Sequence, residues 1–267
     1  MTTSMINHDG GQIGVLSIDA RLPWAGNETI IFHHGVGACR DVWRGWFPTL
    51  VDRYRLVCFD MRGHGSSPAP RDRPWTLDGL VDDLLAVADA AGAERFHLVG
   101  ESVGGTVALA AAIRHPDRVH SLTVANGTHK GGAVENLAPW RQLIDEGGMK
   151  AWSAHMMGQR FHSDALSDSA RVWYEQQQAT ANPTAVLGAA EMLTATDLTP
   201  DLGRITAPTL LLHPDASPFI PVPVMAELHG LIPHAGLQVF ANARHGLPFS
   251  HAAECATLVN QFLNSLA

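Results

Sequence analysis

The sequence predicts an α/β protein, with a doubly wound, mostly parallel eight-stranded sheet and an inserted helical cap. Short apolar runs alternate with amphipathic helical patterns over residues 1–127 and again over 197–267, as expected for a sheet covered by helices on both faces. This alternation lapses over residues 128–196, which have a helical pattern rich in Trp and Met. Polar, glycine-containing turns follow several strands, where such sheets bind their ligands.

Composition limits the classes of partner. The 267 residues suffice for one large α/β domain with an insertion. A net charge of -8 argues against a nucleic-acid partner, and no apolar run has the length of a membrane span. The amino terminus lacks the basic and apolar regions of a secretory signal, and the three scattered cysteines suit a reducing compartment. We therefore expect a cytoplasmic protein that acts on a small molecule, with the formation of a homo-oligomer left open.

Hydrophobic periodicity places the individual elements. An Asp41–Leu50 segment carrying three aromatic residues predicts a short helix, and Thr76 is the expected N-cap of a helix that extends to Ala91. A further helix is expected over 222–231, and a closing helix ends near residue 263. The strands are predicted by apolar or β-branched runs at 12–18, 29–33, 56–59, 96–99, 119–125, 209–212 and 237–240.

The segment from Gly100 to Gly105 reads GESVGG, between a predicted strand and an Ala-rich helix. This is the G-x-S-x-G pattern in the strand–turn–helix setting that its mechanics require. The glycines allow strand and helix to approach closely, and Ser102 is expected in a strained, exposed position at the helix amino terminus. The alternative is an ordinary serine N-cap. A serine hydroxyl becomes a nucleophile only with a base within hydrogen-bond reach.

A second glycine turn, His33-His34-Gly35-Val36-Gly37, follows the 29–33 strand. It is either a simple tight turn or a loop in which the N–H of Val36 points at an oxyanion held near Ser102. His34 is expected to support this loop by hydrogen bonds.

A third loop, DMRGHGSS, follows the 56–59 strand. We expect it to support the edge of the site, with Asp60 and Arg62 as an ion pair and His64 in a structural role.

These segments, HHGVGACRDVW, FDMRGHGSS and GESVGG, together with PTLLLHPDASPFIP and ARHG near the end, resemble the α/β-hydrolase fold superfamily in order and separation. The resemblance covers the chain outside residues 128–196, where such hydrolases insert a helical cap. It implies a serine hydrolase with Ser102 as nucleophile and His245 as base, and backbone N–H groups of Val36 and Val103 as the oxyanion hole. His251 is an alternative base that is better suited to packing or capping the last helix.

The acid that such a triad requires departs from the pattern. Ser217 occupies the usual acid position, and the nearest carboxylate is Asp215. The other familiar position, after the 119–125 strand, carries Asn126, which does not ionise. We assign Asp215 as the acid that orients His245, with capping of the Pro214–Pro218 turn as the alternative.

The substrate pocket is expected beside these turns, closed by the cap. Trp and Met side chains there suit an apolar or aromatic part of a substrate. No cofactor is required, and the histidines lack the spacing of metal ligands. The predicted pocket residues are His34, Gly35, Asn126, Trp140, Trp152, Met156 and Phe219.

The resemblance leaves more than one function open. A small esterase or an enol-lactonase fits the compact length and small cap. A hydrolase of carbon–carbon bonds in vinylogous diketones is an alternative, although the Trp that this group often carries after the base histidine is replaced here by Gly246. Ser102 disfavours epoxide hydrolases and dehalogenases, which need a carboxylate nucleophile. A non-catalytic ligand receptor on the same fold is a third reading.

Overall fold

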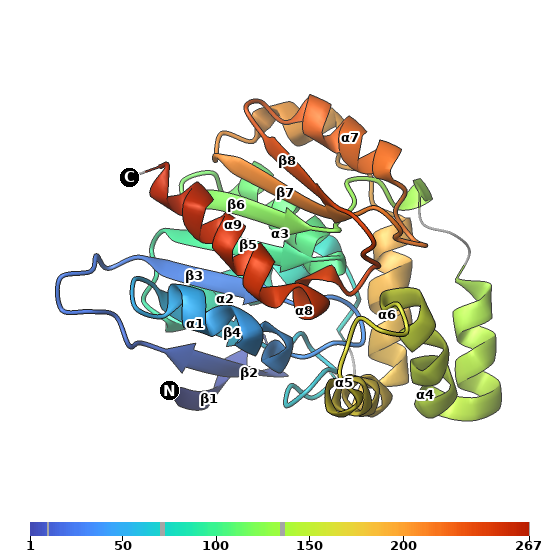
Figure 1. Cartoon of the computed structure of the whole chain (residues 1–267). Coiled ribbons are helices and arrows are strands. Elements are labelled where there is room, and N and C mark those ends of the chain that lie inside the picture. Colours follow the sequence, from blue (N-terminus) through green and yellow to red (C-terminus); the bar gives the residue numbers. More distant parts are fainter. Residues whose placement is uncertain (10, 70–72, 134–136, 267) are drawn as a thin grey trace.

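A mixed eight-stranded sheet forms the centre of the computed structural model, which describes residues 1–9, 11–69, 73–133 and 137–266. The strand order is β1-β2-β4-β3-β5-β6-β7-β8 (Figure 1). β1 pairs antiparallel with β2 and β2 antiparallel with β4, whereas the other neighbours are parallel. The predicted fold class is therefore confirmed. The strands are β1 (Thr2–His8), β2 (Gly11–Ile18), β3 (Thr29–His33), β4 (Arg55–Phe59), β5 (Phe96–Glu101), β6 (Val119–Ala125), β7 (Thr209–Pro214) and β8 (Gly236–Phe240).

The central strands are the ones that the sequence predicts most closely. β3 and β5 are buried along their whole length, because parallel strands covered on both faces are continuous apolar runs. β1 is not among the predicted strands; it is mostly polar and exposed and pairs with β2 alone. An edge strand of that kind has no buried face and so lacks the alternation that reveals strands.

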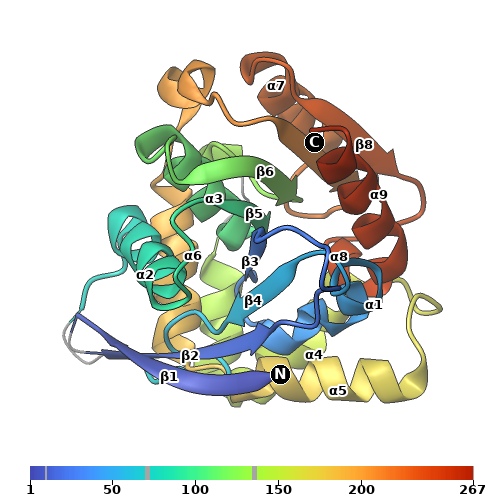
Figure 2. The same cartoon turned by 90° about the vertical axis from the view of Figure 1, so that its left-hand side faces the viewer.

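Helices cover both faces of the sheet (Figure 2). One face carries α2 (Leu77–Ala90), α3 (Val103–Arg114) and α7 (Val222–Leu231), and the other carries α1 (Phe47–Leu50), α8 (Leu247–Ser250) and α9 (Ala252–Asn264). The helix predicted over residues 41–50 is instead a 3-10 helix, η1 (Arg40–Trp46), followed by α1. Its Trp46 ring is fixed by edge-to-face contact with Trp43 and by a 2.8 Å hydrogen bond from Nε1 to the Pro248 carbonyl.

Three helices that come between β6 and β7 in the sequence lie beyond the carboxyl ends of the central strands (Figure 1). They are α4 (Ala138–Arg160), α5 (Asp168–Thr180) and α6 (Pro183–Thr194). Gly148, with φ of 67°, interrupts α4, and the N-cap Asn182 followed by Pro183 starts α6. Two short 3-10 helices, η2 (Gly131–Ala133) and η3 (Thr199–Arg204), flank this insertion, and a bridge between Lys130 and Asp197 joins its two ends.

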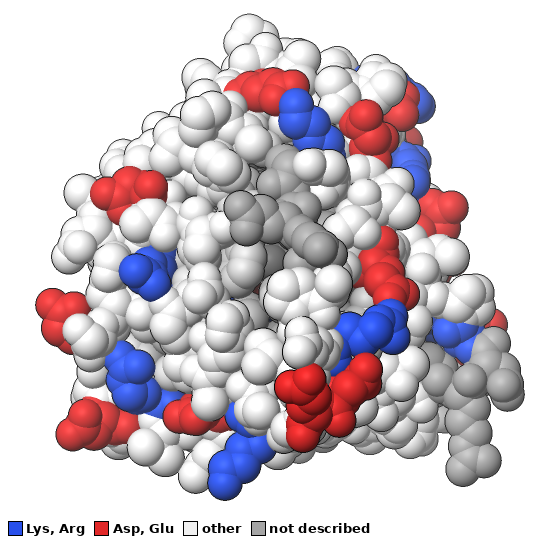
Figure 3. All heavy atoms as spheres, turned by 90° about the vertical axis from the view of Figure 1, so that its right-hand side faces the viewer, with Lys and Arg blue, Asp and Glu red and all other residues white. Residues whose placement is uncertain are grey.

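Acidic and basic side chains lie interspersed on the face of the molecule that carries the cap (Figure 3). Some of them form ion pairs across elements: Arg141 on α4 contacts Glu191 on α6, and Lys130 Nζ lies 2.5 Å from a Glu227 carboxylate oxygen on α7. Among the described residues, none of the helices has both the length and the apolar character needed to cross a bilayer.

Candidate active site

Ser102 lies at a sharp turn between β5 and α3. Its backbone has φ of 53° and ψ of -120°, a strained conformation for a residue with a side chain. The turn depends on two glycines, since a Cβ on Gly100 would lie 2.3 Å from the Gly104 carbonyl oxygen, and one on Gly104 would lie 2.3 Å from the His33 carbonyl oxygen. The sequence thus forces the Ser102 side chain out of the strand and toward the cap.

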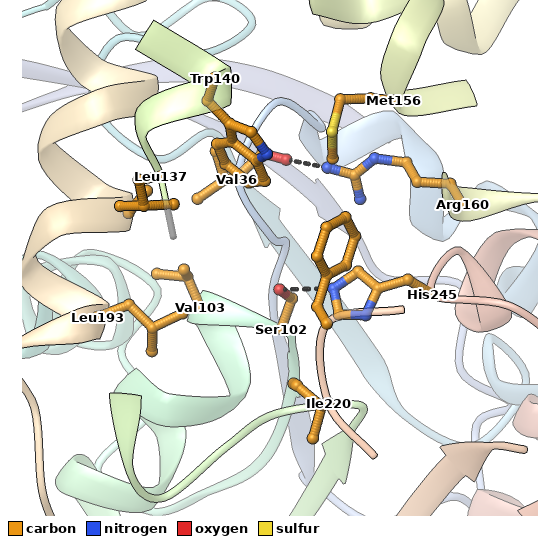
Figure 4. Close-up of a pocket in the computed structure, with 12 residues that line it drawn as sticks. Val36, Ser102, Val103, Leu137, Trp140, Met156, Arg160, Leu193, Ile220 and His245 are labelled. Atoms are coloured by element: carbon orange, nitrogen blue, oxygen red, sulfur yellow. Dashed lines mark hydrogen bonds between the residues drawn. The ribbon is translucent and has the colours of Figure 1, made fainter. Parts of the chain in front are cut away.

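His245 meets this serine from the loop between β8 and α8. Ser102 Oγ and His245 Nε2 are 2.9 Å apart, within hydrogen-bond distance (Figure 4). Asn126, at the end of β6, fixes the backbone of this loop, because its Nδ2 donates a 2.7 Å hydrogen bond to the His245 carbonyl. Three strands that are distant in sequence therefore bring a hydroxyl and an imidazole into contact, as a nucleophile and its base require.

Ser217 occupies the other side of the imidazole. Its Oγ lies 3.1 Å from His245 Nδ1. If Nε2 is to accept the Ser102 proton, Nδ1 must carry the ring hydrogen and donate it to Ser217 Oγ. The backbone N–H groups of Phe219 and Ile220 also point at Ser217 Oγ, at 3.4 and 3.2 Å. This turn therefore places a hydroxyl at Nδ1 and supplies no negative charge there.

Asp215 does not reach His245, and our assignment of it as the orienting acid is corrected by this geometry. Its carboxylate is exposed and accepts hydrogen bonds from the backbone N–H groups of Asn242 and Ala243, at 2.9 and 3.1 Å. These hydrogen bonds hold the pKa of Asp215 below its usual value. Asp215 joins the end of β7 to the loop that carries His245, and its carboxylate binds N–H groups after β8 rather than in the Pro214–Pro218 turn that was the alternative prediction.

His245 is kept neutral by its surroundings. The side chain is buried, and this burial, followed by the positive charge of Arg160 and the nearby His213, holds the pKa of His245 well below 6.5. A neutral imidazole at ordinary pH has a free nitrogen that can accept a proton. The arrangement is consequently ready for base catalysis without prior deprotonation.

The loop after β3 is held by buried polar contacts on several sides. Gly35 N–H donates to Glu101 Oε2 at 3.2 Å, and Gly37 N–H donates to His64 Nε2 at 3.0 Å. His34 accepts a 2.9 Å hydrogen bond from the Met61 N–H at Nε2. Within the described part of the chain, the N–H groups of Val36 and Val103 donate to no acceptor, and both residues line the cavity beside Ser102. Two such donors can hold an oxyanion.

The cavity above Ser102 is lined mainly by apolar side chains. The lining includes Trp140, Met156 and Phe219 of the predicted pocket residues. The volume of the cavity is about 30 Å³. That space admits only a small group. The complete lining in the described chain is Val36, Ser102, Val103, Leu137, Trp140, Met156, Arg160, Ala190, Leu193, Phe219, Ile220 and His245.

Four predicted pocket residues lie behind this lining. Trp152 is fully buried and packs edge-to-face against Trp140, with ring centroids 5.4 Å apart. His34, Gly35 and Asn126 are buried in the loops that support the site and contact it through the backbone hydrogen bonds described above. The sequence pattern identified them as near the site but could not show which side chains reach the cavity.

Two features of the site escaped the sequence analysis. Arg160, at the end of α4, is buried beside the cavity and donates from Nη2 to the Val36 carbonyl at 2.6 Å. Glu101 holds the Gly35 N–H, and burial raises its pKa. The signals were weak: an arginine in the stretch MMGQRF, and a glutamate immediately before Ser102 in a strand that also contains His97.

The predicted ion pair between Asp60 and Arg62 is wrong. Asp60 lies 3.3 Å from Arg40 Nη1, and Arg62 lies 2.5 Å from Asp83 on α2. Asp60 also accepts from the Arg40 and Ser66 N–H groups, at 2.7 and 2.9 Å. Residues two apart at the end of a strand point in similar directions only while the strand continues, and here the chain turns at once.

Other histidines have separate partners. His251 Nδ1 lies 2.9 Å from Ser250 Oγ, at the start of α9. One group with the donor types of a metal site is brought together in the described chain: Glu28, His97 and His120 offer ligand atoms within 4.8 Å of one another. His97 and His120 lie near the beginnings of β5 and β6, and Glu28 directly precedes β3. Ser102 follows the other end of β5, so the group lies at the opposite end of the strands from Ser102.

One class of protein combines three features of this site: a strained serine at a strand–helix turn, an imidazole after the last strand, and a loop after β3 with free backbone N–H groups. The chain belongs to the alpha/beta hydrolase fold family, whose model matches residues 28–252. Of the proteins compared with it, a putative carbamate hydrolase (RutD) of Caulobacter sp. (strain K31) is 28% identical over 251 residues, covering 92% of this chain and 94% of the relative.

Two further proteins are similar to this chain over most of its length. The 2-hydroxymuconate semialdehyde hydrolase of Pseudomonas sp. (strain CF600) is 29% identical over 244 residues, covering 86% of this chain and 84% of the relative. The solved enol-lactonase from Burkholderia xenovorans LB400 superimposes with a TM-score of 0.88 at 21% identity, covering 98% of this chain and all of that chain. Family membership and the named relatives support a hydrolytic enzyme.

Proposed function

We propose that the chain is a serine hydrolase that cleaves a carboxylic ester or lactone of a small, partly apolar substrate through an acyl-enzyme on Ser102. One observation carries the proposal: Ser102 Oγ lies 2.9 Å from the neutral, buried His245 Nε2 at the floor of an apolar cavity. The small cavity favours a short acyl group.

Two steps follow from this geometry. Ser102 Oγ attacks the carbonyl carbon while its proton passes to His245 Nε2, and the oxyanion accepts hydrogen bonds from the N–H groups of Val36 and Val103. When the tetrahedral intermediate collapses, the carbon–oxygen bond to the alcohol breaks, and His245 returns the proton to the leaving oxygen. Water then attacks the acyl-enzyme, with its proton passing through His245, and the acid is released.

The imidazolium formed in each step is stabilised here by Ser217 rather than by a carboxylate. Ser217 Oγ can accept the Nδ1 hydrogen and hold the ring in position. It offers no charge, so we expect slower turnover than in triads that contain an aspartate. Ser217 is thus proposed as a positioning residue of the site.

An assay with p-nitrophenyl acetate and p-nitrophenyl butyrate tests the proposal. Ser102→Ala is expected to reduce kcat by at least about 1,000-fold, whereas Ser169→Ala, an exposed serine on α5, serves as the matched control with unchanged turnover. A phosphonate ester should label the wild type once, on Ser102, as seen by mass spectrometry. Turnover that persists in Ser102→Ala would contradict the proposal, and tight binding without any turnover would favour the receptor reading.

Hydrolysis of a carbon–carbon bond is the second candidate, supported by the relative named as 2-hydroxymuconate semialdehyde hydrolase. The residue after His245 argues against it. A Cβ on Gly246 would lie 2.1 Å from the Phe161 ring, so this position has no room for the Trp expected of that group. Loss of the visible absorbance of a vinylogous diketone, measured beside the ester assay, distinguishes the two activities.

A further inference from the structure

A cluster of three polar side chains lies at the amino ends of neighbouring strands, far from the hydrolytic site. Glu28 directly precedes β3, and His97 and His120 are the second residues of β5 and β6. These three strands are neighbours in the sheet, so side chains that are distant in sequence meet there. One ligand atom from each lies within 4.8 Å of the other two. The proposed ester hydrolysis uses none of these groups.

An irregularity in the pairing of β5 with β6 brings His120 to His97. His97 pairs with Ser121, although the preceding residue of β5 pairs with Val119. His120 therefore falls between the two pairs as an extra residue of β6. Such a bulge redirects side chains, so that two consecutive residues face one residue of the neighbouring strand. Ser121 Oγ lies 2.8 Å from His97 Nδ1, while the His120 ring stacks on the His97 ring with centroids 4.7 Å apart.

The His97 ring is the fixed part of the cluster. Its side chain is 4% exposed, and Tyr54 packs edge-to-face against it with ring centroids 5.7 Å apart. When Nδ1 donates its hydrogen to Ser121 Oγ, the lone pair of Nε2 is free. Histidines that bind a metal are commonly oriented by a hydrogen bond from their second ring nitrogen in this way.

The free nitrogen of this ring faces a carboxylate. His97 Nε2 is buried and has no hydrogen-bond partner in the described part of the chain, and it lies 3.4 Å from Glu28 Oε1. Burial lowers the pKa of His97 to about 4, so the ring is neutral at ordinary pH and this contact is not an ion pair. Two acceptor atoms that face each other repel, and a cation between them would remove the repulsion.

The other two side chains form the open side of the cluster. Glu28 and His120 are 47% and 40% exposed, so an ion can enter from solution and both groups can adjust to it. His120 Nδ1 lies 3.7 Å from the same Glu28 oxygen that faces His97. Ligand atoms that bind one zinc ion at about 2.0 to 2.2 Å lie roughly 3.3 to 3.6 Å apart in a tetrahedron. Both measured separations from Glu28 are therefore close to those that a bound ion requires.

We propose that Glu28, His97 and His120 bind one divalent transition-metal ion of the zinc type, which ties the amino ends of β3, β5 and β6 together. Two imidazoles and one carboxylate suit zinc, whereas magnesium and calcium prefer oxygen ligands alone. Three protein ligands leave a position to water, and the positive charge of Arg95 also acts on His97. We therefore expect an affinity in the micromolar range and an effect on stability.

Calorimetric titration of the full chain tests the site, after removal of metal with EDTA, dialysis and removal of any affinity tag. Zn²⁺ should bind at one ion per chain, and Mg²⁺ should not bind. His120→Ala and Glu28→Gln each remove one of three ligands and should weaken Zn²⁺ binding at least about tenfold. His229→Ala removes an exposed histidine on α7 and is the matched control, with affinity equal to that of the wild type.

Two further measurements report the ligands and the tie. Co²⁺ bound in place of Zn²⁺ should give the visible absorption of a four-coordinate ion, and His120→Ala should lose this absorption. Zn²⁺ should raise the Tm of the wild type and of His229→Ala but leave that of His120→Ala unchanged, because an ion stabilises only the folded state that binds it. Circular dichroism checks that each variant is folded, and the wild-type titration stands without them.

Absence of Zn²⁺ binding in the wild type overturns the inference. Equal Zn²⁺ affinity in the wild type, His120→Ala and Glu28→Gln also overturns it, since the ion would then lie elsewhere on the chain. None of these measurements uses ester turnover, so their result is independent of the function proposed for Ser102.

Discussion

Ser217 Oγ lies 3.1 Å from His245 Nδ1, at the side of the imidazole where a triad carboxylate would be expected. The surrounding turn nevertheless has the donors that a carboxylate needs, since the N–H groups of Phe219 and Ile220 both point at this oxygen. A neutral hydroxyl thus occupies a place prepared for an anion. The substitution keeps the orientation of His245 and removes the charge that would stabilise its protonated form.

Ser217→Asp is expected to raise activity. The two N–H groups can receive the new carboxylate, and an opposite charge at Nδ1 favours the imidazolium that forms during catalysis. We expect kcat on p-nitrophenyl acetate to rise about ten- to a hundredfold, less than the roughly 10,000-fold effect seen where the tautomer is also lost. Steady-state kinetics at pH 7.5 measure the change.

Ser217→Asn is the uncharged control for this substitution. It has nearly the same size as the aspartate variant, so it should give no such increase. A decrease in kcat for Ser217→Asp, with the fold intact by circular dichroism, would show that Ser217 does not mark the acid position.

Asp215→Asn is expected to affect stability more than catalysis. Its carboxylate accepts two backbone hydrogen bonds in the loop before His245 but makes no contact with the imidazole. We expect kcat to fall by less than about tenfold and the free energy of unfolding to drop by about 1 kcal/mol, since the group is exposed. Urea denaturation beside the ester assay checks both; a fall in kcat near 10,000-fold would return Asp215 to the triad.

The sequence could predict those parts of the site that depend on a local pattern of residues. Strand–turn–helix spacing suffices for Ser102, because Gly100 and Gly104 leave its turn few alternatives. The predicted 29–33 and 119–125 strands also have the observed bounds, since both are largely buried segments rich in apolar and β-branched residues. Such elements depend on local patterns, which a single sequence displays.

Contacts made by loops and by the cap could not be predicted in the same way. Asp215 and Ser217 are two residues apart, and the choice between them depends on the path of the turn after β7. Asp60 and Arg62 likewise take partners on other elements. Arg160 reaches the site from the cap, whose packing on the core leaves no periodic signal in the sequence.

The pH profile of kcat/KM should have its acid limb well below pH 6.5. Burial, and then the charge of Arg160, hold the pKa of His245 well below that of a free imidazole, so the base stays neutral as the solution becomes mildly acidic. Measurement between pH 4 and 8 with a neutral ester checks this. The limb should move upward by about one to three pH units in Ser217→Asp, where a carboxylate favours the protonated ring; a wild-type limb at or above pH 6.5 would contradict the stated environment of His245.

Acidification should also unfold the protein through its buried histidines. Burial lowers the pKa of His33, His64, His97 and His213 to about 4, whereas an unfolded chain takes up these protons near pH 6.5. Between these values the unfolded state binds more protons, so stability is lost as pH falls, by about 1.4 kcal/mol per pH unit for each such histidine. The midpoint of urea unfolding, followed from pH 7.5 to 4.5, is expected to decrease steeply below pH 6.5.

His97→Gln, far from Ser102, should make this dependence of the unfolding midpoint on pH shallower while leaving ester turnover unchanged. A dependence equal to that of the wild type would show that His97 is protonated in the folded protein.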